Sequence, residues 1–510
     1  MYTVSDIRIA GYFTVRELLS LTVEEKLNHH TKLTYSGFIG EARAQEITRG
    51  EANRGTMSFF LADELIFSGI PLDVKIEHRN RTYTLTVTCV SYSYLLDVNP
   101  LSASFQDASS SHTEVLGKLY KENGAGKIIF REASDFPTGR PIIKYRETDW
   151  WFTLRMAAIT GNVVYPYSQG EFPGVYFGVL KTGKQLPERH ELRHGYDTSR
   201  CLLQGGPGKP VSLPKYLYMR FKADNSLALG DQVIAEGEQL IVCEKIMGLN
   251  GGILEISYLL SGILPLIPEE ETNPHLAGLT LSGRVIDTAS GKVKLHLDID
   301  REQNPETAFW FDYKPATGNV FQPAQLLGTT ALLKMDGGSG SSAVVSHVIH
   351  KNAGDVEDMG DYNRRFFTTE FRKRMAMVPD MLYFASDKNS LVLADATGVA
   401  AKSTGKFEMS ADGDITITSK RRVRLSTLEK LYVTQDGTKS GIDMSGREIH
   451  IKSPGTRLVS LTRKGASRSM PGLAGRPAEL PPVEMSDALT LNVASATPFV
   501  LRPRRQGHDS

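Results

Sequence analysis

The sequence has few cysteines, no long hydrophobic run and almost no net charge. Its three cysteines, Cys89, Cys201 and Cys243, are far apart in a chain of 510 residues, which predicts buried reduced thiols rather than a disulfide framework. The longest apolar run, residues 253–267, is interrupted by Glu255 and is too short to span a bilayer. The net charge of +1 gives no overall attraction to nucleic acid, so we expect no specific nucleic-acid partner.

The N-terminus also lacks the pattern of a secretory signal peptide. It reads MYTVSDIRIAGYF, without a basic stretch followed by an apolar core. We therefore expect synthesis in the cytoplasm without a signal peptide. Any delivery into a target envelope or outside the cell would then need another route, such as an assembled injection particle.

What the sequence does contain is an apolar pair that recurs every eight residues. The two members of a pair are two residues apart, so both side chains leave the same face of a short extended segment. Glycine and aspartate stand between the pairs, where a sharp turn is needed. The pairs are Leu391/Leu393, Val399/Ala401, Phe407/Met409, Ile415/Ile417, Val423/Leu425 and Leu431/Val433. This pattern predicts stacked short strands, a β-solenoid.

Eight residues supply one strand and one corner, which is too little for a single chain to close a three-sided coil. Three identical chains can close it together, because each then supplies one face per rung and the apolar pairs meet in a dry central column. We therefore predict a homotrimer with these pairs as its core. Two alternatives remain open: a monomeric solenoid with three faces per coil, and an ordinary sheet of alternating strands. The six pairs would make only two coils of the first, and hairpin loops normally vary in length, unlike this constant period.

Residues 1–272 alternate in the manner of strands and contain two predicted helices. Serines 109–111 can cap the first helix, and Thr148 can cap the second, which ends at Gly161. Their apolar faces are Val115, Leu116, Leu119 and Tyr120 in the first and Trp151, Leu154 and Ala158 in the second. We interpret this region as a hub domain of two β-barrels with helical insertions.

The remainder divides into four regions. Residues 276–352 contain five short predicted strands, which suits a small barrel of the oligonucleotide/oligosaccharide-binding (OB) type. Residues 353–385 carry a basic, aromatic run and are predicted to connect this barrel to the repeats. Residues 386–462 form the predicted octad-repeat spike. Residues 463–510, rich in Pro, Arg, Ala and Ser, are predicted to be a mostly flexible tail.

Six stretches of the chain form a further pattern: Leu96-Asp97, 104–107, 145–157, 283–285, 292–300 and 308–311. In this order they resemble VgrG proteins and phage late-control or baseplate-hub proteins. In that family a tyrosine, an acidic pair and a tryptophan open a helix that ends in a leucine-arginine-small step. The resemblance covers about residues 15–460 in the family's domain order.

The resemblance implies a mainly β fold with helical insertions: paired hub barrels, a small OB-type barrel and a C-terminal trimeric β-helix needle. It also implies the role of a hub and membrane-piercing spike in a contractile injection system, such as a phage tail, a tailocin or a type VI-like apparatus. The implied partners are inner tube and baseplate proteins and the target cell envelope. A PAAR-like tip protein and cargo or effectors are left open as further partners.

Two other functions remain as alternatives. His190, Glu191 and His194 match the zincin pattern, in which two histidines one helical turn apart bind zinc and the glutamate activates water. Pro187 and Gly195 leave room for only a short helix, so our preferred interpretation is a charged loop without catalytic, cofactor or metal residues. The second alternative is a trimeric tail fibre or adhesin whose small barrel recognises glycan.

One charged run also needs an interpretation. Residues 420–424, Lys-Arg-Arg-Val-Arg, could bind phosphate. Val423 falls in the register of the apolar pairs, so its neighbours would face water. We therefore interpret this run as a solvated rung of the repeat rather than a nucleic-acid site.

Overall fold

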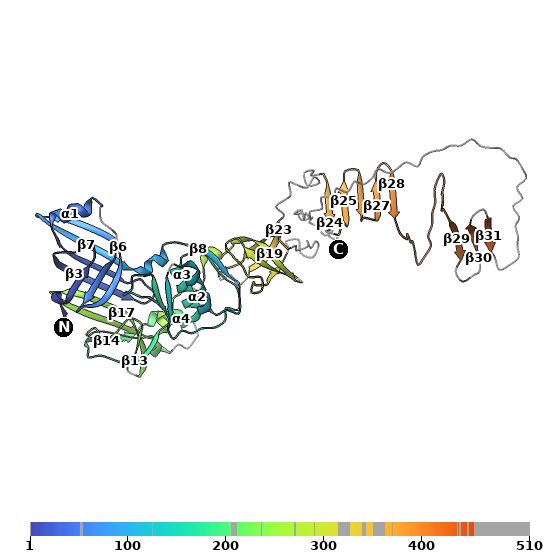
Figure 1. The fold of residues 1–510 in the computed structure, drawn as a ribbon. Coiled ribbons are helices and arrows are strands. Elements are labelled where there is room, and N and C mark those ends of the chain that lie inside the picture. The colour runs from blue at the N-terminus through green and yellow to red at the C-terminus, as the bar shows by residue number, and fades with distance from the viewer. Residues whose placement is uncertain are drawn as a thin grey trace, which may run out of the picture. The chain divides into compact units, whose positions relative to one another are not determined.

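The structure, a computed structural model, is built mainly from β-strands (Figure 1). It describes residues 2–452 except 51–54, 125, 206–211, 236, 270–271, 290, 315–326, 339–342, 350–362, 370, 436, 438–439 and 446–447. The predicted tail, 463–510, lies outside the described residues. The chain divides into two compact units at residues 352/353, and each unit is described by itself. No helix among the described residues is long and apolar enough to cross a membrane.

The first unit contains a 13-stranded sheet. The strands on its main path are, in spatial order, β14 (His190–Tyr196), β15 (Leu217–Lys222), β18 (Ile253–Ser261), β17 (Glu238–Asn250), β3 (Glu17–Lys26), β4 (Lys32–Ile39), β7 (Thr82–Ser91), β6 (Glu64–Arg79), β5 (Met57–Leu61) and β2 (Ile7–Ala10). Strands β1 (Tyr2–Thr3), β13 (Leu180–Gln185) and β16 (Asp231–Ala235) pair off this path. Its largest fully buried core side chains include Tyr35, Phe59, Phe67, Phe221 and Tyr258. In the described residues these strands form one continuous ladder. The two closed barrels expected from the sequence remain a prediction, because alternation identifies strands but not their pairing partners.

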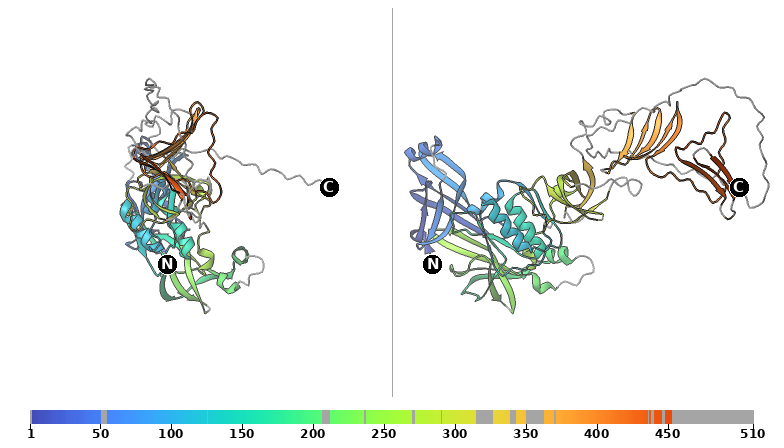
Figure 2. Two further views of the ribbon diagram at one scale, coloured as in Figure 1. Left: turned by 90° about the vertical axis from the view of Figure 1, so that its right-hand side faces the viewer. Right: turned by 45° about the vertical axis from the view of Figure 1, so that its right-hand side comes forward.

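A second layer of the first unit is built around two helices, α2 (His112–Asn123) and α3 (Asp149–Thr160). Ser111 and Thr148 accept hydrogen bonds from the amides of Glu114 and Trp151 (both 3.2 Å), as the sequence predicts. Gly161 ends α3 in the left-handed conformation at φ 70°. Figure 2 shows α2 and α3 side by side, and a hydrogen bond of 3.0 Å joins Tyr120 to Thr153 between them.

The helices are packed among two small sheets rather than placed on the surface of a barrel. One sheet pairs β8 (Leu101–Phe105) with β10 (Ile142–Glu147), and the other joins β11 (Val164–Pro166), β12 (Gly174–Phe177) and β9 (Lys127–Phe130). Helix α3 is buried on nearly all sides, with Trp150 only 3% exposed, whereas Trp151, predicted to face inward, is 46% exposed. A helix that is apolar all round has no single inner face to read from the sequence.

The remaining helices of this unit are short. They are α1 (Glu41–Thr48), α4 (Thr198–Gly205) and the 3-10 turns η1 (Val4–Asp6), η2 (Tyr92–Asp97), η3 (Leu213–Tyr216), η4 (Leu264–Leu266) and η5 (Pro274–Leu276). Among the cysteines, Cys89 and Cys243 are buried and Cys201 is partly exposed, and all three are free thiols, as predicted.

Five strands close a small barrel at the end of the first unit. They are, in barrel order, β19 (Thr280–Ala289), β20 (Lys292–Leu297), β21 (Phe311–Tyr313), β23 (Ala343–Ile349) and β22 (Thr330–Met335). The prediction of a five-stranded barrel over 276–352 is confirmed in outline. Its third strand along the chain, β21, is short and begins at Phe311.

The small barrel is joined to the preceding layer by buried contacts. Ile143 of β10 packs in the barrel's hydrophobic core. The backbone amide and hydroxyl of Ser104 donate to the Asp300 carboxylate at 2.6 and 2.5 Å, and the Gln106 side chain donates to the Leu295 carbonyl at 3.0 Å. Asn273 bonds the Tyr145 carbonyl at 2.9 Å. These contacts tie the barrel to the layer of α2 and α3 through groups that water cannot readily displace.

The second unit consists of two antiparallel sheets separated by a long segment without strands (Figure 1). The first sheet contains β24 (Arg365–Thr368), β25 (Arg374–Val378), β26 (Met381–Ala385), β27 (Asn389–Ala394) and β28 (Gly398–Ser403). The second contains β29 (Lys430–Gln435), β30 (Ser440–Ser445) and β31 (Glu448–Lys452). Residues 365–385, predicted as a connector, therefore belong to the same sheet as the start of the repeats.

Candidate assembly surface of the repeat region

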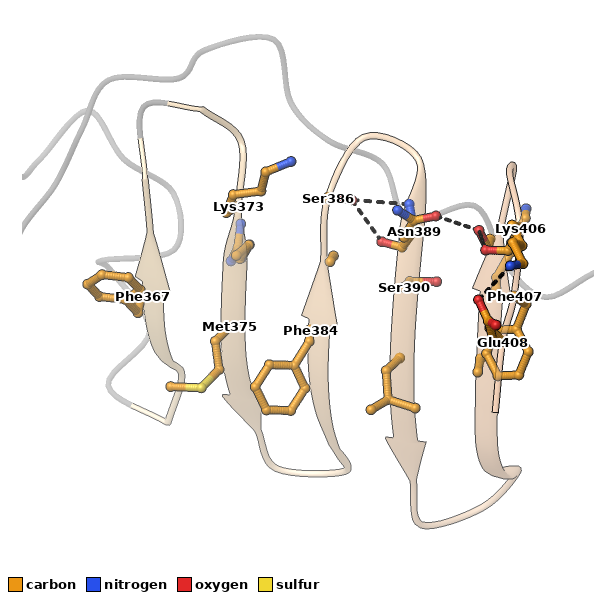
Figure 3. Close-up of a pocket in the computed structure, with 16 residues that line it drawn as sticks. Phe367, Lys373, Met375, Phe384, Ser386, Asn389, Ser390, Lys406, Phe407 and Glu408 are labelled. Carbon is orange, nitrogen blue, oxygen red and sulfur yellow. Dashed lines mark hydrogen bonds and ion pairs between the residues drawn. The ribbon is translucent and has the colours of Figure 1, made fainter. Parts of the chain in front are cut away.

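The sheet β24–β28 carries two rows of side chains across one face, and all of them except Arg365 are apolar. Residues directly opposite each other on antiparallel strands share a face, so the pairing register defines each row. The first row is Phe367, Met375, Phe384, Leu391 and Ala401; the second is Arg365, Met377, Leu382, Leu393 and Val399. Figure 3 shows Phe367, Met375 and Phe384 aligned across successive strands.

This face is exposed within one chain. Met377, Phe384 and Val399 are 52%, 44% and 72% exposed. On the opposite face the Arg374 guanidinium lies 5.2 Å from the Phe366 ring centre and 5.8 Å from that of Tyr383, partly covering both rings. The face that carries the two rows is therefore the one whose apolar side chains would be buried only by contact with another surface.

The segment that follows β28 has exposed apolar pairs and no strand partner. Residues 404–429, all of them described, contain no strand, and the structure gives residues 405–429 no backbone hydrogen bond to another described segment. Six predicted core residues lie here and are 53–68% exposed: Phe407, Met409, Ile415, Ile417, Val423 and Leu425. A segment with strand-like alternation therefore has no ladder partner, and only partial cover, among the described residues.

The last sheet brings apolar pairs onto one face again. Leu431 is opposite Met444, which is opposite Ile449, and Val433 is opposite Ile442, which is opposite Ile451. The octad period does not continue into β30, because the pair after Leu431/Val433 is Ile442/Met444. The repeat region is thus a self-paired sheet, an unpaired middle and a second self-paired sheet.

The predicted core residues fall into all three parts of this region. Leu391, Leu393 and Val399 lie in the two rows, the six central residues lie in the unpaired segment, and Leu431 and Val433 lie in β29. The octad pattern does not include the earlier members Met375, Met377, Leu382 and Phe384. Their apolar i, i+2 spacing is visible in the sequence, but the intervals between their pairs are not eight residues, so they fall outside the constant period.

The zincin match has a different local structure from the one that its chemistry needs. His190 and His194 lie on strand β14 instead of a helix or the predicted loop, with a register irregularity between His190 and Arg193. Histidines four apart on a strand are separated by about four times 3.3 Å, too far to share one zinc ion. The Glu191 carboxylate lies 3.0 Å from the Lys222 ammonium. The sequence of β14 shows no alternation of apolar and polar residues, because this strand is polar and exposed on both faces.

Other arrangements that resemble catalytic sites are closed to substrate. The His30 ring bonds the Ser93 hydroxyl at 2.8 Å and lies 3.7 Å from the Asp97 carboxylate. Ser93 is fully buried and the His30 ring centre lies 4.0 Å from that of Trp150. Nothing can reach this hydroxyl without displacing α3. No three His, Cys, Asp or Glu side chains form a metal cluster in the part of the chain that the structure describes.

Comparison with known proteins gives likenesses in structure but not in sequence. No family model and no curated protein sequence matches the chain. A chain of the Francisella PdpA-VgrG complex, in its half-lidded form, matches 78% of this chain and 87% of its own length with a TM-score of 0.50 and 8% identity. An E. coli type VI secretion component, described as structurally similar to T4 bacteriophage tail proteins, aligns with 67% of this chain over 99% of its own length, with a TM-score of 0.48 and 14% identity. A Shewanella oneidensis prophage tail protein aligns with 51% of this chain over 98% of its own length, with a TM-score of 0.40 and 11% identity.

At this level of identity the likeness concerns the fold alone. The match to the PdpA-VgrG chain extends over most of both chains. In fold the protein is therefore VgrG-like, as the resemblance in its sequence predicts.

Proposed function

We propose that three copies of this chain form the hub and membrane-piercing needle of a contractile injection system. The observation that carries the proposal is the unpaired segment 405–429, whose apolar pairs are more than half exposed and whose backbone has no ladder partner among the described residues. A strand-like backbone needs ladder partners, and exposed apolar side chains need cover. Two further copies around one axis supply both.

The energies favour assembly of this segment. Fully burying a large apolar side chain contributes roughly 1.5–3 kcal/mol, and those of the six central pair members are already partly covered. Burial of the remaining area in a shared column still contributes on the order of several kcal/mol per chain, which is comparable with the total stability of a typical domain. The conformational entropy lost by this segment opposes assembly, so the column must form along its whole length to be stable.

The two self-paired sheets fit the ends of the same column. The rows on β24–β28 place one apolar face per chain, and three such faces can enclose a common core. The octad segment then winds around its two neighbours, and β29–β31 close the column again with one sheet per chain. Because ladder bonds run along such a needle and no long edge is exposed, it resists peeling under an axial load.

The first unit supplies the hub in this proposal. The barrel β19–β23, which we assign to the OB type, is held to the layer of α2 and α3 by Ile143, Ser104 and Gln106, so thrust on the hub reaches the barrel through a packed joint. The proposed partners are inner tube and baseplate proteins above the hub and the target envelope below the needle. A PAAR-like tip protein or cargo would bind at the C-terminal end.

Imaging and co-assembly test this function together. Negative-stain images of the purified protein should show particles with threefold symmetry and a narrow needle, and the same protein should bind the ends of inner tubes from its own system. Single compact particles without a needle would contradict the proposal. A trimer that binds glycan but no tube would favour the fibre or adhesin alternative.

A further inference from the structure

Positive charge is concentrated in one part of the unpaired segment, residues 420–424. Residues 415–428 contain Lys420, Arg421, Arg422 and Arg424 but no aspartate or glutamate in 14 residues. All four cationic residues are exposed, and the structure gives none of them an ion pair with a described residue. Lys406, in contrast, lies 2.6 Å from the Glu408 carboxylate. The charge at 420–424 is therefore not paired with a carboxylate among the described residues.

Local geometry directs these cations away from the apolar column. Val423 and Leu425 occupy the register of the core pairs, so Arg422 and Arg424 leave the opposite face of the extended segment. The Ser419 hydroxyl accepts from the amides of Arg421 and Arg422, both at 3.2 Å, which bends the chain just before them. A bend at this point makes a corner, where side chains face outward.

A leucine stands beside the cations and outside the core register. Leu428 has a relative exposure of 105%, the highest among the exposed large apolar side chains. It follows Leu425 by three residues and precedes Leu431 by three, so it cannot join the column when they do. Residues 415–428 also contain no Phe, Tyr or Trp, whereas binding of single-stranded nucleic acid commonly uses aromatic rings as stacking platforms.

We propose that residues 420–428, the cationic collar, bind the anionic surface of a phospholipid bilayer. The basic side chains attract phosphate-bearing headgroups, and Leu428 enters the headgroup boundary, the combination by which interfacial segments bind membranes. This inference rests on the proposed function, because the trimer places three copies of the collar at one level of the needle. Simultaneous engagement of three collars raises the overall affinity beyond that of one.

Vesicle binding by the full chain tests the collar. We expect the protein to float with phosphatidylcholine vesicles containing phosphatidylglycerol at least tenfold more than with phosphatidylcholine alone, and less as salt rises. Replacing Lys420, Arg421, Arg422 and Arg424 by serine should abolish the preference. The matched control replaces Lys373, Lys388, Lys402 and Lys406 by serine, which removes the same charge from exposed sites of the same unit and should retain it.

Two further measurements decide between partners and separate this inference from the proposed function. Leu428→Ser should weaken vesicle binding several-fold while leaving binding to duplex DNA unchanged. Stronger binding to DNA than to anionic vesicles, release by inorganic phosphate beyond the effect of equal ionic strength, or equal losses in collar and control variants would overturn the lipid assignment. Mass measurements on the same samples report assembly: a monomeric parent contradicts the hub and needle, whereas a trimer that ignores anionic vesicles contradicts only the collar.

Discussion

Several of the residues that resemble the VgrG family form a buried ionic network rather than a functional site. The Lys144 ammonium lies 3.0 Å from the Asp149 carboxylate, and the Arg155 guanidinium lies 2.8 Å from that of Glu147. All four side chains are less than one-tenth exposed. Burial lowers the pKa of Lys144, while Asp149 opposes the shift. The network fixes α3 to β10 through two ion pairs, each between a residue of the strand and a residue of the helix.

Breaking this network at one member should be costly. Glu147→Leu leaves the Arg155 guanidinium buried without its carboxylate, and we expect a loss of about 3–5 kcal/mol in the free energy of unfolding. Fluorescence of Trp150 and Trp151 on α3 during urea unfolding measures it. The control Lys181→Ala breaks the exposed pair with Glu132 and should cost less than about 1 kcal/mol. Equal losses in both variants would show that the buried network has no special role.

The stability of the contact between the small barrel and the layer of α2 and α3 should depend on pH through Asp300. Its partial burial raises the pKa of this carboxyl above the ordinary value of 3.8, against the hydrogen bonds from Ser104. A raised pKa in the folded state means that the stabilisation is present below pH 3.8 and is lost as the pH rises through the folded value. Asp300→Asn should therefore flatten the pH dependence of thermal unfolding above pH 3.8, and Asp298→Asn, an exposed carboxylate of the same barrel, should not.

The zincin hypothesis is testable at Glu191. Because this residue lies on a strand and pairs with Lys222, we expect Glu191→Gln to leave assembly unchanged and the purified protein to hold no stoichiometric zinc after mild chelation. Elemental analysis and a peptidase assay measure this. One zinc per chain, with chelator-sensitive cleavage that disappears in Glu191→Gln, would make the enzyme alternative the better one.

At the scale of elements, the sequence predicts those whose signals are local. Ser111, Thr148 and Gly161 set the ends of α2 and α3 because capping involves neighbouring residues only. The small barrel is found because its strands are short and separated by turns. The order of strands in the 13-stranded sheet is not predicted from the sequence, because the pairing of β3 with β17 joins residues more than 200 positions apart. Strands β24–β26 were missed for another reason: their apolar pairs precede the constant period.

The octad period makes a specific prediction for deletions in the unpaired segment. Removing residues 411–418 takes out one whole repeat, so every later pair still faces the column. Removing only 411–414 moves Ile415 and Ile417 to corner positions. We expect a protease-resistant trimer from the first deletion and a protease-sensitive or aggregated product from the second. If both variants behaved alike in native mass and limited proteolysis, an octad solenoid would be wrong.

At the scale of the whole molecule, the proposed function depends on assembly. One face of β24–β28 and the segment 405–429 carry apolar side chains that are about half exposed or more, although the first unit buries a large core. A chain that folds well in one half and leaves half-exposed apolar pairs in the other is incomplete by itself. The proposed hub, needle and cationic collar all require that three copies of the chain assemble.

The mass of the purified protein in solution is therefore the most direct test. Native mass spectrometry at micromolar concentration should give three times the chain mass of 56.3 kDa. Ile415→Asp should weaken or aggregate the needle, because three carboxylates would meet around one axis without solvent or a cationic partner. A well-behaved parent monomer at that concentration would contradict the account.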